Sequence, residues 1–233
     1  MPAAVACVFD AYGTLLDVDA ALAAESAALG RERAVELSAL WRRKQLEYSW
    51  LRSLMRRHAD FWQVTQDSLD FALQALNLED AALRSRLLAA YRQLAPYPEV
   101  PAMLRALQRH GVRTAILSNG SPDMLRDAVQ AAGIADLLDE VLSVEEVGVF
   151  KPAPEVYRLA TTRLGLAAPD IVFLSSNGWD VHGAASFGFR TVWVNRMRAP
   201  DERLPGEPVR AIAGLDELPG FLGLATDDAV TGA

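Results

Sequence analysis

The residues with the clearest capacity for chemistry lie near the N-terminus, in the stretch VFDAYGTLLD at residues 8–17. Asp10 ends a short apolar run and is followed by a turn that contains Gly13. A carboxylate held at the end of a buried strand can serve as a nucleophile in covalent catalysis. An Asp before a turn is equally often a cap for backbone N–H groups, so Asp10 alone leaves both interpretations open.

Further polar side chains stand where other apolar runs end or where the next helix-like segment begins. They are Ser118, Asn119, Lys151, Ser175, Ser176, Asn177 and Asp180. Each one alone could cap a helix or satisfy a turn. Because ligands of an open parallel sheet bind outside the carboxyl ends of its strands, their recurrence at successive strand ends predicts a single site that includes Asp10.

The composition indicates one substantial folded unit. The chain of 233 residues is about half apolar, which is enough for one large core and a smaller satellite domain. Its formal net charge of -7 disfavours nucleic acid as a partner, because binding to phosphates requires a basic surface. An anionic substrate would therefore need a local cluster of Lys or Arg.

Cysteine content and hydropathy bear on location. The only cysteine is Cys7, inside AVACVF, where we expect a buried core residue and no intramolecular disulfide. A reducing compartment is then the default, so we expect a cytoplasmic protein. No basic apolar leader precedes a cleavage site, and charged residues interrupt the apolar stretches, so we expect neither export nor membrane insertion.

Apolar runs that alternate with helix-like segments predict an α/β fold. The expected strands are residues 4–10, 112–120, 138–144, 170–176 and 190–195, with a further short strand and helix within 209–221. The expected helices are residues 121–133, 152–165 and 179–188, which carry Pro in the first turn or end in Gly. Repeated strand and helix units imply a doubly wound parallel sheet with right-handed crossovers.

A helical block interrupts this alternation after the first strand. Its four expected helices are residues 21–30, 32–61, 65–79 and 80–94, which carry apolar residues at helical spacing and almost no internal Gly or Pro. The block is therefore an insertion. We expect a core domain of residues 1–16 and 97–233 and a helical subdomain of residues 17–96.

Four motifs together resemble those of the haloacid dehalogenase superfamily. They are FDAYGTL, LSNGS, KPAPEVY and SSNGWD, which correspond to an Asp-led loop, a Ser or Thr at the next strand end, a Lys and a late acidic loop. The resemblance runs to about Asn195. It implies a Rossmann-like core, and it identifies the helical insertion with the family's cap.

Two departures separate this sequence from the magnesium-dependent phosphatases that make up most of that superfamily. Tyr12 stands where the phosphatases have a second Asp, and the acids of the metal loop are reduced to Asp180. A phosphoryl centre needs a metal to neutralise charge, and an alkoxide leaving group needs a proton. A halide needs no proton and a carbon centre needs no magnesium. The pattern therefore resembles the L-2-haloacid dehalogenase subgroup, and we expect no metal and no cofactor.

The resemblance implies a displacement mechanism. Asp10 would attack carbon 2 of an (S)-2-haloalkanoic acid in line, which gives an ester, inverts the centre and releases halide. Water would then hydrolyse the ester to the (R)-2-hydroxy acid. Lys151 would lie near Asp10 and favour its ionised form. Thr14 and Ser175 would hydrogen-bond Asp10 or Lys151.

The same resemblance suggests how water and halide are handled. Asp180 and Asn177 are candidates for orienting or deprotonating the hydrolytic water, and Lys151 is not excluded from that role. The cap segment WRRKQLEY supplies the halide-abstracting arginine, which the family pattern places directly after the Trp, at Arg42. Arg43 stands where the subgroup pattern has a polar residue, and it is more simply part of a solvated helix face.

The substrate-binding residues follow from the same pattern. The substrate carboxylate would be held by the Ser118 hydroxyl, by backbone N–H groups near Asn119 and by the turn amides after Asp10, beginning at Ala11. An apolar wall around the halogen-bearing carbon would consist of Tyr12, Leu46, Phe61 and Trp179. Tyr157 would support the Lys151 network. Core packing is the alternative role for Tyr157 and for the wall residues.

Two other functions stay open from sequence alone. One is a magnesium-dependent phosphatase of the same fold, which Tyr12 disfavours. The other is a catalytically silent relative that binds a small molecule, which the joint presence of Asp10, Lys151 and Asp180 disfavours. A serine hydrolase is set aside because no G-x-S-x-G motif occurs, and an Asp and His dehalogenase is disfavoured because only His182 lies near a motif.

The resemblance also implies a homodimer. The aromatic and apolar face of LEYSWLRSLM, residues 46–55, is a candidate interface, although the same stripe would serve equally as the core of the cap.

Overall fold

The computed structural model describes residues 6–18 and 29–224. Its centre is a sheet of six strands in the order β3-β2-β1-β4-β5-β6, and every neighbouring pair is parallel. The strands are β1 Ala6–Phe9, β2 Arg113–Ser118, β3 Glu140–Ser143, β4 Ile171–Ser175, β5 Arg190–Val194 and β6 Arg210–Ile212. This confirms the predicted doubly wound α/β fold.

Strand β1 occupies the middle of the sheet and is buried along its whole length. It pairs with β2 on one side and with β4 on the other, and the strand order changes direction between these two neighbours. Such a point of reversal opens a crevice at the carboxyl ends of the strands. The residue that follows β1 is Asp10. Cys7, within β1, is buried as expected, and burial raises the pKa of its thiol to about 12.

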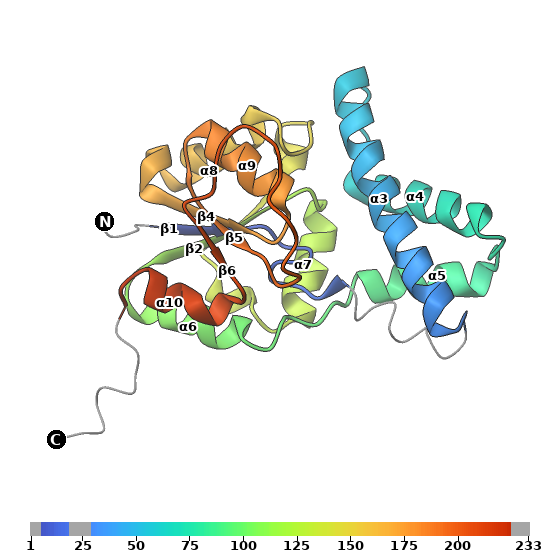
Figure 1. Ribbon diagram of the computed structural model, residues 1–233, viewed down its shortest axis with the longest axis horizontal. Helices are drawn as coiled ribbons and strands as arrows, with labels where there is room; N and C mark the ends of the chain where they lie inside the picture. Colours follow the sequence, from blue (N-terminus) through green and yellow to red (C-terminus); the bar gives the residue numbers. More distant parts are fainter. Residues whose placement is uncertain (1–5, 19–28, 225–233) are drawn as a thin grey trace.

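Helices cover both faces of the sheet, with α8 and α9 over one face and α6 and α10 over the other (Figure 1). Their bounds are α6 Val100–Arg109, α7 Pro122–Ala131, α8 Pro154–Leu164, α9 Gly178–Phe187 and α10 Leu218–Phe221. Short 3-10 turns occupy Ala135–Leu137, Val144–Glu146, Ala168–Asp170 and Leu215–Glu217. None of the described helices is both long and apolar enough to traverse a bilayer.

Helix α6 was not predicted from the sequence. Its buried residues are Val100, Met103, Leu104 and Leu107, which follow helical spacing, and Pro101 stands in its first turn. No helix was predicted between APYPEVP, residues 95–101, and the strand expected at 112–120, but Pro in a first helical turn costs no hydrogen bond. The helix signal was therefore present in the sequence.

Three helices make up the described part of the insertion: α3 Arg31–Met55, α4 Phe61–Ala75 and α5 Ala81–Tyr91. The predicted helix at 32–61 ends earlier than expected, because Arg56 adopts a left-handed conformation (φ 55°). Asp60 then caps α4 by accepting the Gln63 N–H at 2.8 Å, so this helix begins at Phe61 and not at residue 65. The predicted helix at 21–30 falls largely outside the described residues.

These three helices stand beside the sheet and its covering helices (Figure 1). Two adjacent chain segments join the helices to the sheet. The Asp17 N–H donates to the Ala95 carbonyl at 2.9 Å, and the Tyr97 N–H donates to the Leu15 carbonyl at 3.0 Å. Because the two connections lie side by side, the helices meet the sheet at a double-stranded junction next to the turn that follows Asp10.

Candidate active site

Asp10 lies at the carboxyl end of β1, where its backbone N–H continues the sheet by donating to Leu174 at 2.8 Å. The turn that follows is closed by the N–H groups of Leu15 and Leu16, which donate to the Ala11 carbonyl at 2.9 and 3.0 Å. Gly13 has a φ of 86°, and a Cβ there would meet Ser176 Oγ at 3.2 Å. The left-handed backbone at this position therefore favours glycine beside Asp10.

Three side chains hold the Asp10 carboxylate. Lys151 Nζ lies 3.1 Å from Oδ1, while Thr14 Oγ1 and Asn177 Nδ2 each donate to Oδ2 at 3.1 Å. Asp10 itself is 7% exposed. Because a carboxylate oxygen has two lone-pair directions, Oδ2 is saturated and Oδ1 keeps capacity for one more partner among the described residues. The carboxylate is thus held in one orientation, with Oδ1 the oxygen that keeps room for a further partner.

Lys151 is fully buried between two carboxylates. Its Nζ lies 2.8 Å from Asp180 Oδ2 and 4.9 Å from the centre of the Phe173 ring. Burial lowers the pKa of Lys151, but the charges of Asp10 and Asp180 and the hydrogen bonds to them outweigh this, so the net pKa is raised. The backbone N–H of Lys151 donates to Asn119 Oδ1 at 3.0 Å. Asn119 therefore positions the lysine.

Asp180 lies in the first turn of α9 and is inaccessible to solvent. Tyr157 Oη donates to its Oδ1 at 2.8 Å. Burial and the charge of Asp10 raise the pKa of Asp180, whereas Lys151 and the Tyr157 hydrogen bond act against that rise. Tyr157 is itself buried among Phe173, Phe187 and Phe189. It therefore supports Asp180 directly and Lys151 only through Asp180.

Two of the expected serines close turns. Ser118 Oγ accepts the Gly120 N–H at 3.1 Å, and Ser175 Oγ accepts the Asn177 N–H at 3.1 Å. Ser175 thus holds the turn of Asn177, where the sequence suggested Asp10 or Lys151 as its partner. Ser176 joins the site instead, because its N–H donates to Thr14 Oγ1 at 2.8 Å and fixes the hydroxyl that contacts Asp10. Because Ser175 and Ser176 are adjacent and identical in type, the sequence does not indicate which of them joins the Asp10 network.

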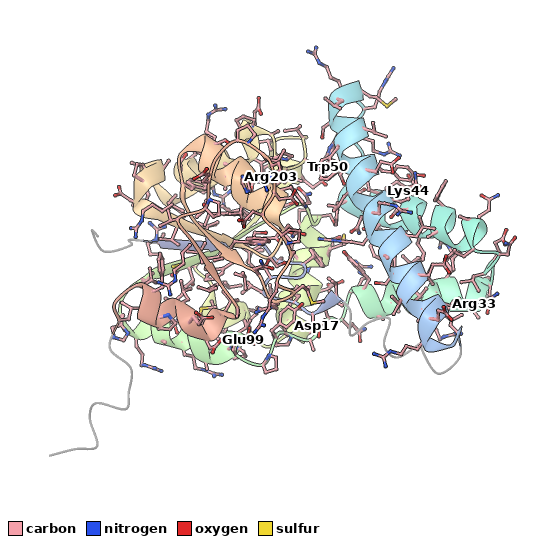
Figure 2. All side chains as sticks on the ribbon, in the orientation of Figure 1. Asp17, Arg33, Lys44, Trp50, Glu99 and Arg203 are labelled. Atoms are coloured by element: carbon pink, nitrogen blue, oxygen red, sulfur yellow. The ribbon has the colours of Figure 1, made fainter. Side chains whose placement is uncertain are left out.

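Helix α3 brings Arg42 to the same place. Its Nη2 lies 3.4 Å from Asn177 Oδ1, and its Nη1 donates to Gln45 Oε1 at 3.0 Å. Arg43, the next residue, is exposed. Trp50 lies on the side of α3 that faces the sheet (Figure 2), with its ring 5.4 Å from that of Trp179. The helical insertion and the strand-end loops therefore meet at the candidate site.

Aromatic rings line the other side of Asp10. Tyr12 stacks on Tyr91 at 5.3 Å between ring centres, and its ring lies 6.3 Å from Phe61. Tyr12 Oη is buried and has no hydrogen-bond partner among the described residues. Burial, Tyr91 and Asp10 raise the pKa of Tyr12, so its hydroxyl stays protonated. Leu46 is half-buried on α3. Two further residues of this region, Tyr91 and Gln45, were not predicted from the sequence as site residues.

The cationic partner that the two site carboxylates share is Lys151. Among residues 6–18 and 29–224, no group of three or more His, Cys, Asp or Glu side chains is arranged to hold a metal ion. His182 Nδ1 lies 3.1 Å from the Leu204 carbonyl, on the loop side of α9. The site therefore combines two buried carboxylates, the ammonium that they share, one guanidinium and the protonated buried phenol of Tyr12.

Comparison with known proteins gives consistent matches. The haloacid dehalogenase-like hydrolase family matches residues 5–188. The (S)-2-haloacid dehalogenase 1 of Pseudomonas sp. (strain CBS-3) is 48% identical over 93% of this chain and 96% of its own length. The (S)-2-haloacid dehalogenase of Pseudomonas sp. (strain YL) is 52% identical over 81% of each.

A solved structure with a bound ligand matches as well. It is the L-2-haloacid dehalogenase from Xanthobacter autotrophicus with chloropropionic acid covalently bound. It is 39% identical to this chain, with a TM-score of 0.86 over 94% of this chain and 98% of that one. The likeness therefore extends through both the sheet and the helical insertion.

Proposed function

This chain belongs to the haloacid dehalogenase-like hydrolases and to their (S)-2-haloacid dehalogenase subgroup, and we propose that Asp10 is the nucleophile of its carbon–halide hydrolysis. The substrates are (S)-2-haloalkanoic acids and the products are (R)-2-hydroxy acids and halide. The observation that carries the assignment is the Asp10 carboxylate, held by Lys151, Thr14 and Asn177 with Oδ1 left to react.

In the first step, Asp10 Oδ1 attacks carbon 2 of the substrate from the side opposite the halogen. A carbon–oxygen bond forms while the carbon–halogen bond breaks, and the halide leaves with the bonding electrons. Thr14 and Asn177 occupy Oδ2 and so direct Oδ1 at the substrate. Lys151 stabilises the carboxylate charge before the attack. The product of this step is an ester with an inverted carbon 2.

Charge at the two ends of the substrate is balanced by different groups. Arg42 stands beside Asn177 and stabilises the departing halide. The Ser118 hydroxyl accepts a turn N–H and keeps its own proton for the substrate carboxylate, together with backbone N–H groups at Ala11 and Asn119. The phenol of Tyr12 stays protonated, and Tyr12, Phe61, Leu46 and Trp179 exclude water during the displacement.

In the second step, water attacks the carbonyl carbon of the Asp10 ester. The bond between this carbon and Oδ1 breaks, and Oδ1 leaves as the hydroxyl group of the product with one proton of the water. The other proton passes to the base, and the carboxylate of Asp10 regains one oxygen from water. Asp180 is the best-placed base, since burial raises its pKa and makes it a stronger proton acceptor. Asn177 orients the water, and Lys151 connects Asp180 to the ester oxygen.

The decisive experiment is halide release by purified protein in EDTA. We expect chloride from (S)-2-chloropropionate, none from the (R) enantiomer and none in the Asp10→Asn variant. A single turnover in H₂¹⁸O should place the label in the Asp10 side chain, as seen by mass spectrometry. Absence of chloride release, together with magnesium-dependent cleavage of a phosphate monoester, would overturn the proposal in favour of a phosphatase.

The division of the chain and its assembly belong to the same proposal. Residues 17–96 act as a cap subdomain over a core of residues 1–16 and 97–233, and the junction of Leu15 to Asp17 with Ala95 to Tyr97 supports this.

The enzyme is cytoplasmic, in keeping with a single buried thiol. It is a homodimer, which the exposed Leu51, Leu54 and Met55 on α3 support. Light scattering after size-exclusion chromatography measures that state, and Leu54→Lys should shift it toward monomer.

A further inference from the structure

We propose that Gln45 is a positioning residue that aims the Arg42 guanidinium at the leaving halide. The inference rests on the proposed function, in which Arg42 stabilises the halide. Gln45 does not approach Asp10 in any described contact and acts only through Arg42. Its side chain is 1% exposed, on the buried face of α3 that otherwise consists of Ala34, Leu37, Trp41 and Ser49. A buried amide on such a face needs partners for all its polar atoms.

The orientation of the Gln45 amide follows from its neighbour Thr65 on α4. Thr65 Oγ1 donates its single proton to the Phe61 carbonyl at 2.7 Å. Thr65 Oγ1 can therefore only accept a hydrogen bond from Gln45. The Gln45 group that faces it at 2.8 Å must be the NH₂ group, Nε2. The carbonyl oxygen Oε1 of Gln45 is then turned toward Arg42. A chain of donors therefore runs from Arg42 through Gln45 and Thr65 to the backbone of α4.

Arg42 is consequently held at two points. Its Nη1 donates to Gln45 Oε1 at 3.0 Å, and its Nη2 lies 3.4 Å from Asn177 Oδ1, whose Nδ2 donates to Asp10. Because a guanidinium is planar, contacts at two nitrogens set the direction of the whole group. One contact comes from the helical insertion and the other from a strand-end loop.

The same amide also fixes an aromatic residue of the site. Tyr91 Oη lies 3.2 Å from Gln45 Nε2 and 3.3 Å from Oε1, and its ring stacks on that of Tyr12. Gln45 thus contacts both Arg42 and Tyr91, the aromatic partner of Tyr12, and Tyr91 also interacts with Arg42. A buried glutamine with only a structural role would need hydrogen-bond partners for its polar atoms, but Arg42 would not need to be one of them.

The experiment compares halide release from (S)-2-chloro-, 2-bromo- and 2-iodopropionate by wild type and by Gln45→Met. Methionine keeps the length of the side chain and removes the amide. We expect kcat for the chloride to fall about 10- to 100-fold, the loss that misplacing a stabilising group typically produces. Bromide and iodide should be affected progressively less, because they are better leaving groups and need less stabilisation. KM should change little.

Further variants separate positioning from packing. Thr65→Val should show the same dependence of the rate loss on the leaving group as Gln45→Met. Thr65→Ser, which keeps the hydroxyl, should release the three halides at wild-type rates. Ser49→Ala is the matched packing control, because Ser49 is buried one turn further along α3 and donates only to the Gln45 carbonyl. In an Arg42→Lys background, Gln45→Met should cause no additional selectivity among halides.

The outcomes discriminate between the two levels of the proposal. If wild type releases no halide, the proposed function fails. If wild type releases halide and Gln45→Met either keeps its rates or loses all three halides by one factor, Gln45 has only a structural role and the inference is overturned. Should Gln45→Met fail to fold, Thr65→Val and Thr65→Ser decide by the same criterion.

Discussion

At the scale of single residues, the site depends on a lysine that serves two carboxylates at once. Lys151 is buried, and its charge is compensated by Asp10 at 3.1 Å and Asp180 at 2.8 Å. Two carboxylates and one ammonium leave a net negative charge, which Arg42 and the Tyr12 phenol border. Arg42, which α3 brings beside Asn177, adds the positive charge that an anionic substrate needs in this acidic protein.

Replacing Lys151 with Met should destabilise the protein by about 3–5 kcal/mol at neutral pH, because both carboxylates are left buried without a counterion. In wild type, Lys151 lowers the pKa of Asp180 and so opposes the rise that burial causes. Without Lys151 that rise becomes larger. A carboxyl with a raised pKa stabilises the fold when protonated and loses that contribution as the pH rises. The deficit relative to wild type should therefore shrink as the pH falls, as measured by urea unfolding. A deficit independent of pH would contradict this account.

Tyr157→Phe tests the base assigned to Asp180. The Tyr157 hydrogen bond lowers the pKa of Asp180, so its removal should raise that pKa. The acid limb of the profile of kcat against pH should then move to higher pH. Stability should fall by about 1–3 kcal/mol, since a charged acceptor loses a buried donor. Phe189→Leu, beside the Tyr157 ring, is the control for packing, and it should lower stability without moving the acid limb.

At the scale of elements, local sequence signals account for most of the fold. Apolar runs identified the strands, and Pro in a first turn or Gly at an end identified α7, α8 and α9. Helix α6 was missed because prolines at 96–101 masked its apolar spacing. Asp10, Lys151 and Asp180 could be predicted from their positions at or after strand ends. Parallel strands place their carboxyl ends together, whatever the length of the connections between them.

Gly183→Ala should destabilise the protein by about 1–3 kcal/mol, the usual cost of overpacking. A Cβ at this position of α9 would lie 2.6 Å from both the Pro152 Cβ and the Tyr157 Oη. The variant should also reduce kcat, because the displaced Tyr157 hydroxyl supports Asp180. Gly220→Ala in α10 has no atom within 4 Å of its Cβ and should be neutral. Equal unfolding midpoints for the two variants would refute the close contact.

At the scale of the whole molecule, the site exists only where the helical insertion meets the sheet. Arg42 reaches Asn177, Trp50 reaches Trp179, and Ser53 Oγ accepts the Phe150 N–H at 3.2 Å. Sequence patterns predict the buried face of α3 but not which loop it faces, because no local signal encodes that distance. Gln45 and Tyr91 were missed for this reason, whereas Arg42 was found only through resemblance to a family.

A further described link between the helices and the core, apart from the site, is made by Glu145. Its carboxylate lies 2.8 Å from His58 Nε2 and accepts the Phe61 N–H, one of the unpaired donors at the start of α4, at 3.2 Å. The His58 ring also packs 4.8 Å from that of Phe150. If this link holds the helices over Asp10, its loss should loosen α3 and α4 without unfolding the sheet.

Glu145→Ala should therefore speed amide hydrogen exchange at residues 56–64 by about tenfold, while the strands stay protected, since one charged acceptor for a helix N–H is lost. Halide release should decline in kcat/KM, because Arg42 spends less time beside Asn177. Glu146→Ala is the matched control: Glu146 pairs with Arg163 at 2.9 Å, within the core. Unchanged exchange at 56–64 in Glu145→Ala would mean that the other described contacts, such as those of Arg42 with Asn177 and Ser53 with Phe150, hold the helices without Glu145.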